Sequence, residues 1–160
     1  NETMASPPDH SWGCITHWDT QFLLPETIAH LHHSTKISPD TGIFTCYGSR
    51  SHVNSTQQML PDGCSYDPNI INHIKIAREQ TKNLYEITEL TRHISGFLMI
   101  ISKATWDNYK FVEDMKCLGV DNLYSNRILQ AGLPIRRMEG VYVWHQYRIE
   151  TNVKDVNHLL

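Results

Sequence analysis

The apolar segment "GFLMIIS" at residues 96–102 strongly limits the folds that this sequence can adopt. A strand with one face in water alternates apolar and polar side chains, and this segment does not alternate. We therefore expect it to form a central strand that is covered on both faces. The segment is far too short to cross a bilayer as a helix, which takes about 20 apolar residues.

Strand and helix patterns alternate along the chain, which favours an α/β fold with a single domain over residues 1–160. The last helix should end at Gly132, because glycine is favoured just beyond a helix C-terminus. Residues 49–69 are polar and read as a long loop. The other expected strands are "WGCIT", "IFTCYG", "PIRRM" and "GVYVWHQY", and the expected helices cover residues 25–34, 69–84, 103–109 and 122–131.

The composition is that of a soluble globular protein, with 40% hydrophobic and 19% charged residues among 160. The net charge of −3 excludes a basic field that would hold nucleic acid or an anionic membrane. No signal-peptide pattern opens the sequence. We expect a cytoplasmic protein without a transmembrane segment, whose four cysteines are free thiols.

Three polar clusters stand at the ends of expected strands. His17, Trp18 and Asp19 follow the first strand, Asp121 stands just before a helix, and His145 lies near the end of the last strand. In open α/β sheets, ligands collect beyond the carboxyl ends of strands. The three clusters are therefore expected to converge in space.

Four segments occur in the order found in GT-A glycosyltransferases of the family 2 type: "CITHWDTQFLLP", "SGFLMIISKATW", "LGVDNLYSNRILQAGLPI" and "GVYVWHQYR". The chain resembles that family over residues 12–148. In the family, the first segment carries an Asp-x-Asp motif and the last a late histidine. The resemblance implies a GT-A-like, Rossmann-type mixed sheet flanked by helices, with the nucleotide-binding N-terminal half missing before Asn1.

The resemblance also implies a metal site. Asp19 matches the second carboxylate of the Asp-x-Asp motif, which binds the cation that holds the sugar-nucleotide diphosphate. His145 matches the late histidine of the metal shell, and His17 stands at the first motif position. The expected ion is Mn²⁺ or Mg²⁺, and a histidine ligand moves the preference toward Mn²⁺.

The remaining roles that the resemblance implies concern the two substrates. Asp121 matches the carboxylate that deprotonates the acceptor hydroxyl, a step that typically contributes about 10²–10⁴-fold. Ser95, Gly96 and Phe97 match the segment beneath the donor sugar, and Arg148 lies where a cation could meet phosphate oxygens. The implied reaction is an inverting transfer from a nucleotide-diphosphate sugar to a glycan or another hydroxyl acceptor.

Two features depart from the family pattern. His17 replaces the first aspartate of the motif, and the bulky Trp18 occupies its middle position. The second departure is the missing front half, which would leave a sheet edge able to pair with another chain in a homo-oligomer. Both departures favour an alternative, in which a catalytically impaired GT-A-like remnant acts as a carbohydrate- or protein-binding module.

Simpler interpretations of the same residues remain open. Asp19 could be a turn residue, Asp121 a helix N-cap and His145 a structural histidine. A metallohydrolase built from His17, Asp19 and His145 is a third functional class, although the sequence lacks an H-E-x-x-H frame. The histidines of the first helix, His30, His32 and His33, are expected on its solvated face.

Overall fold

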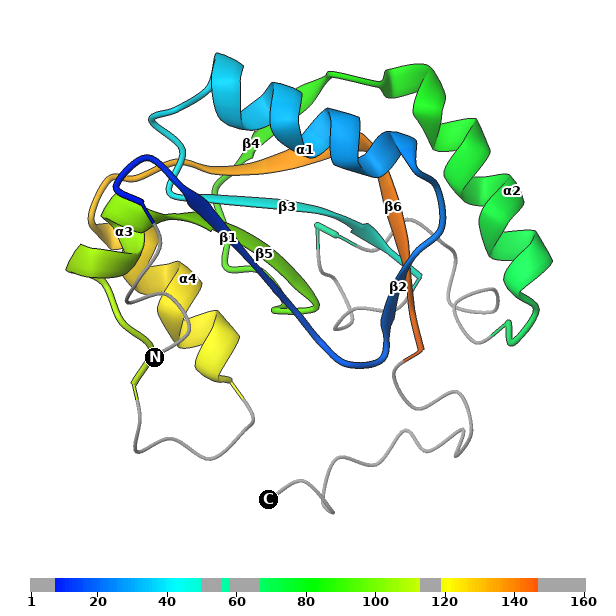
Figure 1. Cartoon of the computed structure of the whole chain (residues 1–160). Coiled ribbons are helices and arrows are strands. Elements are labelled where there is room, and N and C mark those ends of the chain that lie inside the picture. The colour runs from blue at the N-terminus through cyan, green and yellow to red at the C-terminus, as the bar shows by residue number, and fades with distance from the viewer. Residues whose placement is uncertain (1–7, 50–55, 58–66, 113–118, 147–160) are drawn as a thin grey trace.

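The computed structural model describes residues 8–49, 56–57, 67–112 and 119–146. These residues form a mixed α/β structure, in which one six-stranded sheet has helices on both faces (Figure 1). The elements are β1 (Trp12–Thr16), β2 (Thr20–Phe22), α1 (Glu26–Ile37), β3 (Ile43–Gly48), α2 (Ile70–Gln80), the short 3-10 helix η2 (Thr81–Asn83), β4 (Ile87–Leu90), β5 (Leu98–Ser102), α3 (Lys103–Asn108), α4 (Val120–Gln130) and β6 (Ile135–His145).

The strands follow the order β1-β5-β3-β6-β2, and β4 also pairs with β6. The β3–β6 pair is parallel, and the other described pairs are antiparallel. β5 lies between β1 and β3, and its residues Leu98–Ile101 are buried. The expectation of an apolar strand covered on both faces is therefore confirmed.

The two strands at the ends of this order, β1 and β2, are consecutive in the chain. Residues 17–19 alone connect them, so the sheet must curl until its outer strands meet at one short loop. β1, β3 and β6 end near this loop and β5 begins there, because Thr16 is opposite Leu98 and Thr20 is opposite His145 (Figure 1). The curl thus gathers several strand ends at one rim of the sheet.

Each face of the sheet packs into its own apolar core. One core joins Ile43, Met99, Ile101 and Ile135 of the sheet to Trp106 of α3 and to Tyr124 and Ile128 of α4. The other core contains Phe44, Leu98, Ile100, Val141 and Val143, with Leu31 of α1 packed against it. Fully burying a side chain of this size typically stabilises the fold by about 1.5–3 kcal/mol, so these cores hold the sheet curled.

The end of α4 agrees with the sequence. Gly132 adopts a positive φ of 75° and follows the helix directly. Its N–H donates to the Leu129 carbonyl at 3.0 Å, and Leu133 N–H donates to the Ile128 carbonyl at 3.2 Å. These two bonds form a Schellman motif, in which glycine takes the left-handed position at little cost.

The expected segments "PIRRM" and "GVYVWHQY" are both found as strand, but their division into two strands is wrong, because they form the single strand β6. The pairing of β3 with β6 shifts register between Cys46 and Tyr47, and the strand continues through Gly140. A Cβ atom at Gly140 would lie 2.7 Å from Leu84 Cα, so the glycine permits η2 to approach the strand. Gly140 therefore marks a close backbone contact within one continuous strand.

The solvated interpretation of the first helix is wrong for His30, which is fully buried. Its ring lies 5.6 Å from the ring of Tyr85, and the ring of His33 lies 4.3 Å from the same tyrosine. Among the described residues, neither ring nitrogen of His30 has a hydrogen-bond partner. Histidine is common on both surfaces and interiors, so the sequence pattern could not separate the two cases.

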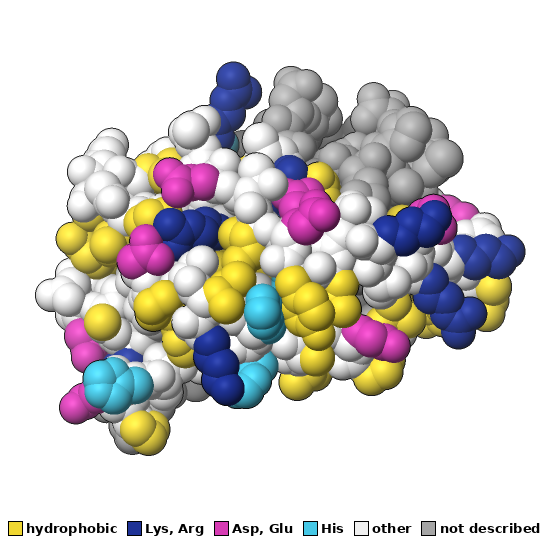
Figure 2. Space-filling model, turned by 90° about the horizontal axis from the view of Figure 1, so that it is seen from above, with side chains coloured by type: hydrophobic (Ala, Val, Ile, Leu, Met, Phe, Trp, Pro, Cys, Tyr) yellow, Lys and Arg dark blue, Asp and Glu magenta, His cyan; other side chains and the backbone are white. Residues whose placement is uncertain are grey.

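The face formed by α1 and α2 is seen from above in Figure 2. Lys and Arg side chains are interspersed with Asp and Glu side chains there, and hydrophobic and histidine side chains lie between them. The described side chains of this face thus form no continuous basic field of the kind that holds nucleic acid.

Candidate metal centre

The loop that closes the sheet, residues 17–19, is held by backbone hydrogen bonds on three sides. Thr20 N–H donates to the His17 carbonyl at 3.1 Å, which closes a tight turn. His17 N–H donates to the Phe97 carbonyl at 3.3 Å, and Gln146 N–H donates to the Asp19 carbonyl at 2.8 Å. The side chains of this loop therefore start from backbone that is tied to both β5 and β6.

His145 is the last residue of β6 and is buried, with 3% of its surface exposed. Its backbone N–H donates to Ser49 Oγ at 3.0 Å, and the Ser49 hydroxyl donates back to the His145 carbonyl at 3.0 Å. The Phe97 ring stacks on the imidazole with 5.1 Å between ring centroids. These contacts fix the imidazole at the rim, facing the loop.

Three potential ligand atoms meet at this rim. His17 Nδ1 lies 3.3 Å from His145 Nε2, and Asp19 Oδ1 lies 3.4 Å from the same nitrogen. The ligand atoms of the three residues all lie within 4.8 Å of one another. His17 is exposed, Asp19 is partly buried and His145 is buried, so the cluster opens to solvent on the side of His17.

These separations suit a shared divalent cation. Two ligands at adjacent positions, with bonds of about 2.1 Å, lie about 3.0 Å apart in octahedral and about 3.4 Å apart in tetrahedral geometry. Asp19 Oδ1 is buried, and its 3.4 Å contact with His145 Nε2 does not have the geometry of a good hydrogen bond. A buried carboxylate oxygen that is poorly paired is costly, and a cation between the three atoms would satisfy it.

The electrostatics of His17 and Asp19 favour the binding of a cation. Burial lowers the pKa of His17, and the neighbouring His145 lowers it further, against the opposing effect of the nearby Asp19 and Asp121 carboxylates. Burial opposes ionisation of Asp19, but the two imidazoles outweigh it and lower the pKa of that carboxyl. A neutral imidazole beside an ionised carboxylate is the state that a metal requires, because protonated ligands cannot bind it.

A second carboxylate, Asp121, lies in the first turn of α4. Its Oδ2 accepts a hydrogen bond from Gly96 N–H at 2.6 Å, and its Oδ1 accepts one from Asn122 N–H at 2.9 Å. A Cβ atom at Gly96 would lie 2.8 Å from Asp121 Cβ, so the glycine makes this close approach possible. Since Gly96 adjoins Phe97, the carboxylate is anchored next to the wall of the cluster.

The other expected site residues that remain to be placed are Ser95, Phe97 and Arg148. Ser95 N–H donates to Gln57 Oε1 at 2.6 Å, and its carbonyl accepts from Gln57 Nε2 at 3.1 Å. Phe97 is fully buried beneath His145, so its side chain supports the imidazole and does not face a ligand. Arg148 lies outside the described residues.

Two residues that position the site were missed by the sequence reasoning, Ser49 and Gln57. Both are fully buried, and both fall in residues 49–69, whose polar composition predicts a loop. Gln57 also donates to Thr45 Oγ1 at 2.6 Å, which connects that segment to β3. A single serine or glutamine in a polar stretch carries no signal for such a role.

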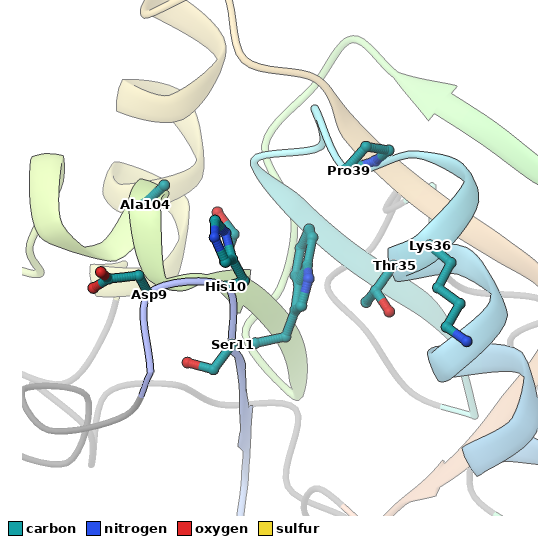
Figure 3. Close-up of a pocket in the computed structure, with 9 residues that line it drawn as sticks. Asp9, His10, Ser11, Thr35, Lys36, Pro39 and Ala104 are labelled. Carbon is teal, nitrogen blue, oxygen red and sulfur yellow. The ribbon is translucent and has the colours of Figure 1, made fainter.

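A separate pocket lies at the opposite end of β1 from His17 (Figure 3). Asp9, His10 and Ser11 approach it from before β1, Thr35 and Lys36 from the end of α1, and Ala104 from α3. None of the three clustered side chains lines it. The pocket and the candidate metal centre are therefore two distinct features of the surface.

No known protein family, curated protein or solved structure matches this chain. Among the described helices, none combines the length and the apolar character that crossing a membrane requires.

Proposed function

We propose that this chain has a GT-A-like fold and acts in an inverting glycosyltransferase reaction, in which it binds the metal and the acceptor. It would use a nucleotide-diphosphate sugar and an acceptor hydroxyl. The observation that carries the proposal is the meeting of His17 Nδ1, Asp19 Oδ1 and His145 Nε2 at one rim of the sheet. The anchored carboxylate of Asp121 in the neighbourhood of this rim adds a candidate base.

The meeting of four segments at one rim supports the finer fold assignment, although four of the five described strand pairs are antiparallel. The four segments that carry the resemblance contribute the end of β1, the beginning of β5, the beginning of α4 and the end of β6. Contacts between these segments join all four at one rim, including His17 N–H to the Phe97 carbonyl and Gly96 N–H to Asp121. Such a gathering is what a shared active site of that family requires.

His17, Asp19 and His145 would hold the cation. A shell with two imidazoles and one carboxylate favours Mn²⁺ over Mg²⁺, because imidazole suits transition metals better than it suits Mg²⁺. A divalent cation neutralises the charge that develops on a departing diphosphate. His17 would complete the shell at the solvent side, where the donor has access.

Asp121 would accept the proton of the acceptor hydroxyl. Its two backbone hydrogen bonds fix the carboxylate, and an ionised carboxylate has lone pairs left for a further donor. The fixed orientation matters because general-base catalysis needs the base within hydrogen-bond reach of the hydroxyl. The metal and the base would thus act on the leaving group and on the nucleophile, respectively.

Calorimetric titration with Mn²⁺ and then with UDP- and GDP-sugars tests the proposal. Mn²⁺ should bind and should be needed for donor binding, and Asp19→Ala should abolish both. Asp107→Asn is a matched control, because Asp107 is an exposed carboxylate on α3 that pairs with Lys103. Retention of metal-dependent donor binding in the Asp19 variant would contradict the proposed function.

A non-catalytic binding module is the second candidate. It is favoured by the two backbone N–H groups that already engage the Asp121 carboxylate, as they would in a purely structural role. Metal-dependent donor binding without any sugar transfer or donor hydrolysis would favour this candidate over the enzyme.

A further inference from the structure

Trp18 is the exception among the tryptophans of this chain. Its side chain is 96% exposed, whereas Trp106 is 2% and Trp144 9% exposed. Trp12 is partly buried and packs on Phe44 with 5.4 Å between ring centroids. A buried tryptophan typically removes about 150–250 Å² from water, so Trp18 leaves a large apolar face available.

The position of Trp18 links this face to the candidate metal centre. It is one of the two central residues of the turn closed by Thr20 N–H and the His17 carbonyl. The residues on either side of it, His17 and Asp19, supply two of the three converging ligand atoms. The Trp18 backbone is therefore fixed beside any group that the cluster binds, while its indole remains in solvent.

The two sides of the cluster differ in a way that matters for a ligand. On the protein side, Phe97 stacks on His145 and closes the site with buried apolar surface. On the solvent side stands the exposed side chain of His17, and Trp18, the next residue of the loop, is exposed as well. A ligand whose anionic oxygens reach the cation must extend past this solvent side, next to the loop that carries Trp18.

We propose that Trp18 stacks on the ring of a phosphate-linked ligand, a nucleoside or a sugar, whose phosphate oxygens occupy the metal centre. This inference rests on the proposed function, because it requires a cation between His17, Asp19 and His145. The phosphate would bind through the cation and the ring through the indole. Loss of a base–aromatic stack by alanine substitution typically weakens binding by about 5- to 160-fold.

The test compares Trp18→Ala, Trp18→Tyr and wild type by calorimetry with Mn²⁺ alone, and then with Mn²⁺ plus pyrophosphate, UDP, GDP or a hexose 1-phosphate. Pyrophosphate has no ring, UDP and GDP carry a nucleoside, and the hexose phosphate carries only a sugar. Ile28→Ala is the control for loss of an exposed apolar side chain, because Ile28 is 63% exposed on α1.

Trp18→Ala should bind Mn²⁺ and pyrophosphate within twofold of wild type and should bind the ring-bearing ligands at least fivefold more weakly. Trp18→Tyr should recover most of that loss, since it restores an aromatic face. A loss confined to UDP and GDP identifies a nucleoside as the stacked ring, and a loss shared by the hexose phosphate identifies a sugar.

Two results would overturn the inference while leaving the proposed function standing. One is unchanged affinity of Trp18→Ala for every ring-bearing ligand, and the other is an equal loss for pyrophosphate. If wild type does not bind Mn²⁺ at all, the proposed function fails and this inference fails with it. Folding is not at issue in these variants, because the exposed indole contributes little to the core.

Discussion

Asp19 Oδ1 and His145 Nε2 lie 3.4 Å apart, although their residues come from opposite ends of the described chain. The contact exists because β2 pairs with the end of β6, which brings Thr20 opposite His145. A carboxylate and two imidazoles that meet in this way form a shell for a cation.

Asp121→Asn tests the proposed base without changing any of the three proposed metal ligands. The amide is nearly isosteric and can still accept from Gly96 N–H, but it cannot take a proton from an acceptor hydroxyl. We expect unchanged Mn²⁺ affinity and a transfer rate lowered by at least about 100-fold. Single-turnover transfer assays measure the rate, and a variant with wild-type activity would remove Asp121 from the mechanism.

Gly96→Ala tests the anchoring of Asp121 without touching its chemistry. The new methyl group would lie 2.8 Å from Asp121 Cβ and 3.3 Å from Oδ2, so the carboxylate must move. Since small displacements of a catalytic group can cost about 10²-fold, we expect slower transfer at unchanged Mn²⁺ affinity. A crystal structure of the variant with Asp121 in place, combined with lowered transfer, would refute this explanation.

Ser49→Ala removes the hydroxyl that bonds both backbone groups of His145. Loss of these two hydrogen bonds at buried backbone groups should lower the free energy of unfolding by about 1–3 kcal/mol, as measured by denaturant titration. Because outer contacts orient metal ligands, Mn²⁺ affinity should fall about 10- to 100-fold. Thr16→Val is the comparison variant for Ser49→Ala. It also removes one hydroxyl beside the site, but that hydroxyl donates to the Phe97 carbonyl at 2.9 Å and not to His145.

Acid should destabilise the protein through His30. Burial, with a smaller contribution from the nearby His33, lowers the pKa of His30 from 6.5 to about 4. The unfolded chain therefore binds a proton more readily than the folded chain, so stability decreases as the pH falls from 6.5 toward 4. The decrease should amount to at most about 3 kcal/mol.

Denaturant titrations between pH 7.5 and 4 measure this effect, and His30→Phe should make the free energy of unfolding less dependent on pH. His32→Phe is the matched control, because His32 is exposed on the same helix. An equal pH dependence in His30→Phe and wild type would rule out His30 as its source.

The sequence was informative where a pattern reports on local backbone. The strands β1, β3 and β5 and the helix ending at Gly132 follow from apolar runs and glycine preference, and the structure confirms them. β2 and β4 have three and four residues and were not predicted. Such short strands form because β6 offers them a partner, and no local pattern encodes a partner distant in sequence.

The candidate site was likewise predictable only in part from the sequence. The expectation that polar residues at strand ends would meet correctly brought His17, Asp19 and His145 together, while their roles stay predictions. The buried serine and glutamine behind them could not be predicted, because their importance lies in contacts with backbone far away in the chain. Buried residues that support a site are therefore harder to recognise in a sequence than the proposed ligand residues themselves.

The short connection between β1 and β2 has a consequence for how this protein responds to its surroundings. Opening the curled sheet and separating the three ligand side chains are the same movement, since both require residues 17–19 to leave β6. An ion held there would bind the native state alone, so the melting temperature should rise with the logarithm of its concentration above saturation. The melting temperature would then measure how far the metal centre is occupied, and a change in occupancy would change the melting temperature.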